Sequence, residues 1–198
     1  MTKNLIGLAA GTAIAALALT GCGTADSESG SSAGNDRPVG ASSEGPAQNV
    51  RVPQESEPLT EKSEEGLKAF AYYWISYNSY AQQTGKTDKL QELSSGDCTY
   101  CADEIDMIAN VYEDGGWMAG GDPRVTNVDP DLAKGESTGT ALIEYSEIPA
   151  TIFDSEGNKK STVEPKEPTV LTVKASFDDG SWTMESIKET PDAELPAE

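Results

Sequence analysis

Apolar residues recur at helical spacing through the first part of the chain that can fold, beginning at Leu67. Six of the thirteen aromatic residues fall between Phe70 and Tyr80. Thr60 is a suitable N-cap for this predicted helix, and Gly85 is a suitable end for it. A helix with so much aromatic area normally forms part of a hydrophobic core or the wall of a pocket.

The rest of the pattern predicts two more helices and a series of strands. The helices cover 88–93 and 102–112, and a glycine pair at 115–116 ends the second of them. After the helices, alternating apolar and polar positions predict antiparallel strands, of which 169–177 is the clearest. A tight turn at 178–180 follows that strand. The predicted strands cover 125–128, 140–148, 150–153, 161–164, 169–177 and 181–187.

Helices first and antiparallel strands afterwards are typical of an α+β domain, with N-terminal helices packed on one face of the sheet. From Leu59 to Lys188, the element order resembles the NTF2-like (SnoaL-like) cone, with Trp117 near the helix-to-sheet junction and Trp182 in the closing strand. The resemblance implies a curved sheet that encloses a pocket. We expect this pocket to be lined by Phe70, Trp74, Tyr77, Trp117 and Phe177.

The aromatic helix also has a plainer interpretation. Phe70 and Trp74 fit a hydrophobic core as well as they fit a pocket wall. Tyr72, Tyr73 and Tyr80 lie partly off the main apolar stripe, so they fit either the core or a surface that contacts a protein or a glycan.

Trp117 lies between two glycine pairs, at 115–116 and 120–121. Glycines let the chain turn sharply and approach other backbone closely. A large indole in so flexible a segment gains most by filling a cavity, because that contact offsets the entropy of ordering the glycines. We therefore expect Trp117 to form a wall of the cone, near Trp74 and Phe177.

The N-terminus has the features of an exported protein. An apolar run from Leu5 to Leu19 follows Lys3, and it has the length of a signal-peptide core rather than of a membrane span. The run ends in Leu19-Thr-Gly-Cys22, where the chain resembles a bacterial lipoprotein precursor. The resemblance implies cleavage after Gly21, a diacylglycerol on Cys22 and an extracytoplasmic location on the cell membrane. The alternatives are an ordinary secreted protein that is cut at a nearby small residue and an uncleaved anchor.

Four segments are therefore predicted. They are a signal peptide over 1–21, a lipidated Cys22 with a disordered linker over 22–58, the α+β domain over 59–188 and a polar tail over 189–198. The linker has no aromatic, leucine or isoleucine residue, so it cannot bury enough apolar area to offset the entropy of ordering it.

The composition excludes some classes of partner. A formal charge of −20 argues against nucleic acid and against docking on anionic lipid. The chain has no histidine, which is the usual general base and the commonest metal ligand. Acidic clusters at 103–106, 129–131 and 178–179 lack the spacing of a calcium loop. Asp103 and Glu104 fall in the first turn predicted for the third helix, where carboxylates are favourable. We interpret these acids as solvated surface and expect no metal and no cofactor.

Cys98 and Cys101 precede the third predicted helix. A thioredoxin-like redox pair would need a buried strand just before it, whereas the preceding residues are polar and helical. We favour a structural disulfide, which is typical of proteins outside the cell, over a redox-active pair. Together with Asp114-Gly-Gly-Trp117, the pair also resembles an uncharacterised domain of actinobacterial lipoproteins, and this resemblance implies no activity.

Three functions fit these observations. The first is a non-catalytic lipoprotein whose domain binds a small apolar ligand or an envelope protein, or supports an envelope assembly. The second, implied by the resemblance to the cone, is an isomerase or hydrolase that acts on a small apolar substrate. The third is a largely structural spacer whose cone is filled in. An enzyme should bury a carboxylate with a shifted pKa in its pocket, whereas a binding module should show an open aromatic groove without one.

Overall fold

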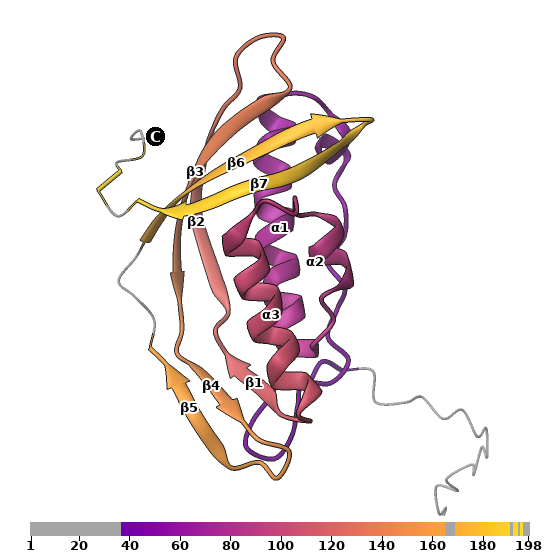
Figure 1. Cartoon of the computed structure of the whole chain (residues 1–198), viewed down its shortest axis with the longest axis vertical. Helices are drawn as coiled ribbons and strands as arrows, with labels where there is room; N and C mark the ends of the chain where they lie inside the picture. The colour runs from indigo at the N-terminus through magenta and orange to yellow at the C-terminus, as the bar shows by residue number, and fades with distance from the viewer. Residues whose placement is uncertain (1–36, 165–168, 191, 194, 196–198) are drawn as a thin grey trace, which may run out of the picture. The chain divides into compact units, whose positions relative to one another are not determined.

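The computed structural model describes residues 37–164, 169–190, 192–193 and 195 (Figure 1). All of these residues belong to one compact unit that begins at Asn35. The predicted signal peptide, Cys22 and the first part of the predicted linker lie outside the described residues. Within the described residues, no helix has the length and apolar character that crossing a membrane requires.

The helical part contains one short 3-10 helix and three α-helices: η1 (Glu57–Thr60), α1 (Glu64–Thr84), α2 (Asp88–Glu92) and α3 (Thr99–Glu113). The predicted cap of α1 is wrong, because Thr60 closes η1 and Ser63 caps α1 by accepting a hydrogen bond from the Gly66 amide at 3.0 Å. The predicted end is confirmed: Gly85 ends α1 in the left-handed conformation, at a φ of 73°.

The strands form two antiparallel sheets. The smaller has the order β1-β4-β5, and the larger has the order β2-β3-β6-β7. The strands are β1 (Trp117–Gly120), β2 (Pro123–Asp131), β3 (Thr138–Glu147), β4 (Ala150–Phe153), β5 (Lys159–Val163), β6 (Thr169–Asp178) and β7 (Ser181–Glu189). The larger sheet bends around α1, so that β2 and β3 run along the helix while β6 and β7 cross it (Figure 1). The predicted α+β class is confirmed.

The two sheets are joined by a bend in one long hairpin. β1 continues into β2 and β3 continues into β4, while β1 pairs with β4 and β2 pairs with β3. Gly120 and Gly121 form the bend with φ values of 82° and 80°. A side chain on Gly120 would collide with the carbonyl oxygen of Pro149, on the other arm of the hairpin. The glycines therefore permit both the turn and the close approach of the two arms.

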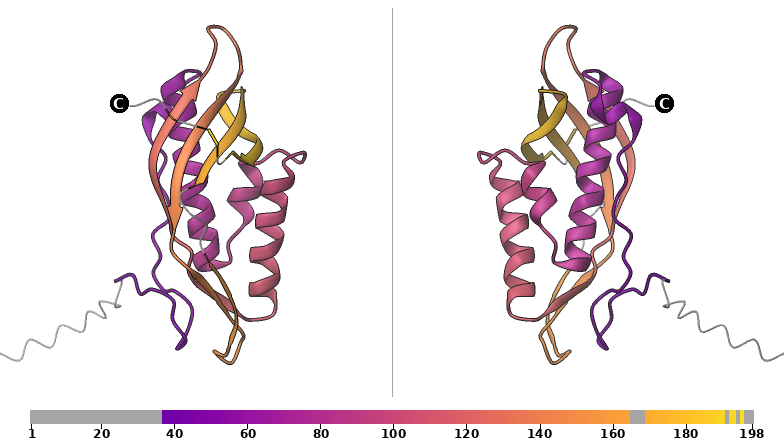
Figure 2. Two further views of the ribbon diagram at one scale, coloured as in Figure 1. Left: turned by 90° about the vertical axis from the view of Figure 1, so that its left-hand side faces the viewer. Right: turned by 90° about the vertical axis from the view of Figure 1, so that its right-hand side faces the viewer.

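α1 lies between the β2–β3 strands on one side and α2 and α3 on the other (Figure 2). Tyr73 and Tyr80 are consequently buried along with Phe70, Trp74 and Tyr77, and only Tyr72 is exposed. Of the three tyrosines predicted to lie partly off the apolar stripe, only Tyr72 can therefore contact a partner at the surface. The core continues into α3 and the larger sheet through Leu90, Ile105, Ile108, Ile143, Leu171, Val173, Met184 and Ile187.

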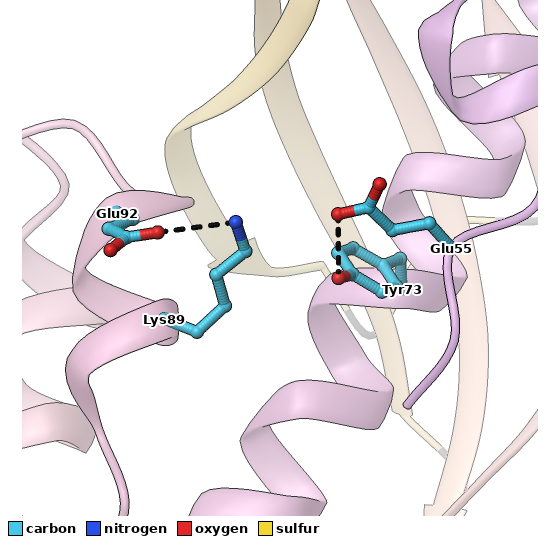
Figure 3. Close-up of polar contacts among 4 residues, drawn as sticks. All are labelled: Glu55, Tyr73, Lys89 and Glu92. Carbon is cyan, nitrogen blue, oxygen red and sulfur yellow. Dashed lines mark hydrogen bonds and ion pairs between the residues drawn. The ribbon is translucent and has the colours of Figure 1, made fainter. Parts of the chain in front are cut away.

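The segment 37–56, which we call the N-terminal strap, corrects the predicted linker. Val39 and Gln48 exchange backbone hydrogen bonds of 2.9 Å, which close a small hairpin. Further along, the hydroxyl of Tyr73 donates to Glu55 at 3.2 Å, which ties the strap to α1 (Figure 3). Backbone pairing orders this segment although it has few apolar side chains, so the disordered prediction for 22–58 is wrong from residue 37 onward.

Figure 3 also shows the ion pair of α2, in which Lys89 Nζ lies 3.2 Å from Glu92 Oε2. Exposed pairs of this kind contribute at most about 1 kcal/mol. The short helix is held instead by the buried Leu90 and by the loop after it, where Ser95 N donates to Met184 O in β7 at 2.8 Å.

Candidate functional site

A pocket of about 200 Å³ opens where α1, α3 and the bend of the long hairpin meet. Gly121, which forms part of the bend, adds no side chain there. The pocket has a mixed lining of aromatic, apolar and acidic side chains. Its side chains include Gln82, Tyr100, Glu104, Met107, Met118, Tyr145, Ser146, Glu147, Ile148, Ala150, Val163, Glu164 and Glu189.

Glu104 is held by amide side chains from the central helix. Asn78 Nδ2 donates to Glu104 Oε2 at 3.2 Å, and Gln82 Nε2 donates to Asn78 Oδ1 at 2.8 Å. Asn78 and Gln82 are both buried and lie four residues apart, so they share one face of α1. Tyr112 in α3 donates to the carbonyl oxygen of Gln82 at 2.7 Å, which fixes the end of α1 against α3.

Burial raises the pKa of the Glu104 carboxyl above its ordinary value, because desolvation penalises the charged form. Hydrogen bonds from Asn78 and Gln82 act in the opposite direction, and the charge of neighbouring Asp103 adds to the increase. Glu104 is therefore a carboxyl group whose environment favours the neutral form more than water does.

Two tyrosines share the pocket with Glu104. Burial is the main reason that the pKa of Tyr100 and the pKa of Tyr145 are raised, and the carboxylates of Glu104, Glu147 and Glu189 raise both further. Both hydroxyls therefore stay protonated at any physiological pH. The carboxylates that act on both tyrosines also make the potential inside the pocket negative.

Sequence reasoning missed Glu104 because it placed the start of α3 three residues too late. α3 begins at Thr99, so its first turn contains no acidic residue, and Glu104 lies in the second turn. Tyr100, Glu104 and Met107 then lie on one face at helical spacing, beside the core-facing Ile105 and Ile108. The spacing Tyr100-x-x-x-Glu104-x-x-Met107 was the signal that could have identified the site.

None of the five residues predicted to line a pocket lines this one. Phe70, Trp74 and Tyr77 belong to the core instead. Phe177 is partly buried against the core, and its ring meets Trp182 edge-on at a centroid distance of 5.2 Å. The aromatic stripe is thus core, as its plainer interpretation suggested, because both sides of α1 are covered.

Trp117 is buried, but away from Trp74 and Phe177. It stacks on Phe153 of β4 at a centroid distance of 5.7 Å. Its Nε1 donates to the carbonyl oxygen of Ser42 in the N-terminal strap at 2.8 Å. The predicted place of Trp117 is therefore wrong: it joins the smaller sheet to a segment that sequence reasoning took to be disordered.

Cys98 and Cys101 form a disulfide, as predicted, and both are buried. Cys98 is also the N-cap of α3, where its Sγ accepts a hydrogen bond from the amide of Cys101 at 3.3 Å. The disulfide thus fixes the first turn of the helix that carries Tyr100 and Glu104.

The remaining acidic clusters lie apart from the pocket. Asp178 ends β6, and Asp179 and Gly180 make the tight turn into β7 with φ values of 47° and 84°. Within the described part of the chain, no group of three or more His, Cys, Asp or Glu side chains is placed to hold a metal ion.

The fold is similar, at low sequence identity, to several solved structures. The intermembrane-space region of the chloroplast protein ARC6 is 14% identical with a TM-score of 0.45, over 66% of this chain and 98% of that one. A protein with a cystatin-like fold from Caulobacter vibrioides is 9% identical with a TM-score of 0.40, over 67% and 92% of the two chains. An NTF2-like protein of unknown function from Prochlorococcus marinus is 10% identical with a TM-score of 0.28, over 44% and 61%.

The comparison with curated proteins found no significant match. The comparison with protein families matched one model over residues 37–188, which includes the N-terminal strap, the helices and both sheets. The chain therefore belongs to DUF6318, a family of unknown function.

Proposed function

We propose that this chain is a lipid-anchored extracytoplasmic protein whose domain binds a small molecule in the Glu104 pocket. The half-buried carboxyl group of Glu104, held by Asn78 at the edge of an open cavity, is the observation that carries the proposal. Burying an ionisable group costs free energy unless a partner compensates it. A partly buried ionisable group in a concave pocket is typical of sites that bind a ligand, whether or not they also act on it.

Two further features support the proposal. The motif Leu19-Thr-Gly-Cys22 and its resemblance to lipoprotein precursors support the anchor. The order of three helices followed by a bent antiparallel sheet, with a pocket at their junction, supports a cone of the NTF2-like type.

The proposal can be tested on residues 23–198, which include the whole compact unit from Asn35 onward. Small neutral, cationic and anionic fragments would be added to isotope-labelled protein, and amide shifts would be followed by NMR. We expect some fragments to shift pocket residues such as Tyr100, Met118 and Ser146. Met107→Trp should fill the cavity and abolish these shifts, while Glu113→Trp, at an exposed position of the same helix, should preserve them. If the domain only supports an envelope assembly, no fragment should shift the pocket residues.

A second candidate is an isomerase or hydrolase of the same fold. It is favoured by the raised pKa of Glu104 beside the protonated hydroxyls of Tyr100 and Tyr145. A carboxylate with a raised pKa is a better-matched general base at neutral pH, and a phenol can donate to an oxyanion. In an enzyme, Glu104→Gln would keep ligand binding and lose turnover. Ligand recovered unchanged after long incubation with the wild-type protein would contradict this candidate.

A further inference from the structure

The described side chains that line the pocket carry charges of one sign. Four carboxyl side chains line it, from Glu104, Glu147, Glu164 and Glu189, and the described residues that line it include no lysine or arginine. They come from α3, from the end of β3, from the residue that follows β5 and from the end of β7. Carboxylates of three of these residues raise the pKa of both pocket tyrosines, so their fields overlap inside the cavity. A ligand that carries a negative charge would be repelled from such a site.

Glu104 is half-buried, and its side chain accepts hydrogen bonds from neutral amides. Amide donors compensate a buried carboxylate only in part, as the raised pKa of Glu104 indicates. A positive charge beside it would compensate it more completely, because opposite charges attract strongly where water is partly excluded.

The other lining residues show what kind of cation fits. Met107, Met118 and Ala150 contribute apolar surface, and Tyr100 and Tyr145 contribute aromatic rings. A hard metal ion such as Ca²⁺ takes six to eight oxygen ligands and gains nothing from this surface. An alkylammonium ion fits both the acidic and the apolar part of the lining. Its charge pairs with a carboxylate, while its carbon atoms contact methionine and the aromatic rings.

We propose that the pocket binds a small organic cation, with its ammonium group at the Glu104 carboxylate and its carbon skeleton against Tyr100, Tyr145 and Met107. This assignment rests on the proposed binding function and names its ligand class. The pocket of about 200 Å³ limits the ligand to a few carbon atoms beyond the ammonium group.

The assignment implies a link between binding and protons. The ammonium group favours ionised Glu104, so affinity should be highest above the raised pKa of the free carboxyl and should fall as the pH drops through it. Other titratable groups act on Glu104 or share its pocket: Asp103 and Tyr100 on its own helix, and Tyr145, Glu147 and Glu189 from the sheet. A Glu104→Gln variant separates its contribution from theirs.

Three probes with closely matched branched carbon skeletons test the proposal: 3-methylbutylamine as the cation, 3-methyl-1-butanol as the neutral compound and 3-methylbutanoate as the anion. Each would be titrated into residues 23–198 at fixed ionic strength, and dissociation constants would be read from NMR shifts of pocket residues. We expect the amine to bind at least about tenfold more tightly than the alcohol, which corresponds to one ion pair of about 1.4 kcal/mol. The anion should not bind.

Glu104→Gln should remove the preference for the amine and its pH dependence, while Glu113→Gln, the same change at an exposed position of α3, should keep both. Equal binding of the alcohol and the amine, or an unchanged preference in Glu104→Gln, would overturn the cation assignment and leave the binding function standing. If the amine shifts only residues outside the pocket, the cation assignment is also wrong. If no fragment of any charge shifts the pocket, the binding function itself is wrong.

Discussion

Asn78 Nδ2 lies 3.2 Å from Glu104 Oε2, and this hydrogen bond joins the central helix to α3 at the edge of the pocket. Both residues come from helices that contribute mainly apolar side chains to the core. A buried amide that supports a half-buried carboxyl is a costly arrangement for a structure that needs only stability. We infer that the pair is retained for what the pocket binds.

Replacing Glu104 by Gln should therefore stabilise the domain at neutral and alkaline pH. The folded-state pKa of Glu104 is raised above its ordinary value of 4.5, so the stability linked to this group is fully present below that value and is lost as the pH rises through the folded-state pKa. The variant avoids the loss, because glutamine has a similar size and no charge. Its melting temperature should exceed that of the wild type at about pH 8, by roughly 2–4 °C for each kcal/mol recovered.

The same comparison at about pH 4 should show little difference, because the wild-type carboxyl is then largely protonated. Glu113→Gln is the matched control and should leave the melting temperature unchanged at both pH values, since its side chain is exposed. A Glu104→Gln variant that is less stable than wild type at pH 8 would contradict the account of this residue.

Trp117 should behave as an anchor for the N-terminal strap. Trp117→Ala removes its stacking on Phe153 and its hydrogen bond to Ser42, so we expect a loss of about 3–5 kcal/mol, as for other large buried aromatics. Hydrogen exchange at the amides of Val39 and Gln48 should also speed up, because their hairpin loses its contact with the domain.

Trp117→Phe provides the control for that experiment. It keeps an aromatic ring against Phe153 and loses only the hydrogen bond to Ser42, which should cost about 1 kcal/mol. If urea unfolding of Trp117→Ala matches the wild type, Trp117 is a surface contact and the proposed anchoring is wrong.

The cysteine pair should be a structural bond. Thiol labelling of residues 23–198 without reductant should find neither Cys98 nor Cys101 free. Replacing both by Ser should cost about 2 kcal/mol from the entropy of a four-residue loop, without abolishing folding. Rapid reversible reduction near about −270 mV, the potential of thioredoxin, would instead indicate a redox role.

The anchor depends on Cys22, which can be examined in the full-length protein in a bacterial host. Mass spectrometry of the mature N-terminus should find Cys22 as the first residue with a diacylglycerol on its thiol. Cys22→Ala should prevent lipidation and cleavage before residue 22. A mature protein that begins at another small residue and carries no lipid would support the secreted alternative.

The larger sheet was the most predictable part of the fold. Alternation at 169–177 and the turn at 178–180 predict β6 and β7 closely, because Leu171 and Val173 point inward on a strand with one buried face. The strap could not be predicted this way, since backbone hydrogen bonds and contacts with distant residues order it, and neither leaves a periodic pattern.

The site was less predictable than the fold. Its acid comes from α3, while its amides come from α1, and residues 26 positions apart in sequence show no sign of being neighbours. The predicted start of α3 also concealed the site. An acid in the first turn of a helix is explained by the helix dipole, but Glu104 lies in the second turn, where the dipole does not explain its presence.

The most direct test of the central claim is a pH titration of the Glu104 side-chain carboxyl carbon, followed by ¹³C NMR in residues 23–198. The carboxyl should titrate above its ordinary value of 4.5, and added 3-methylbutylamine should move the titration to lower pH. The carboxyl signal of Glu104 is assigned as the one that disappears from the spectrum of the Glu104→Gln variant. A carboxyl that titrates at or below 4.5, with no change on adding the amine, would show that Glu104 is ordinary solvated surface and would contradict the account.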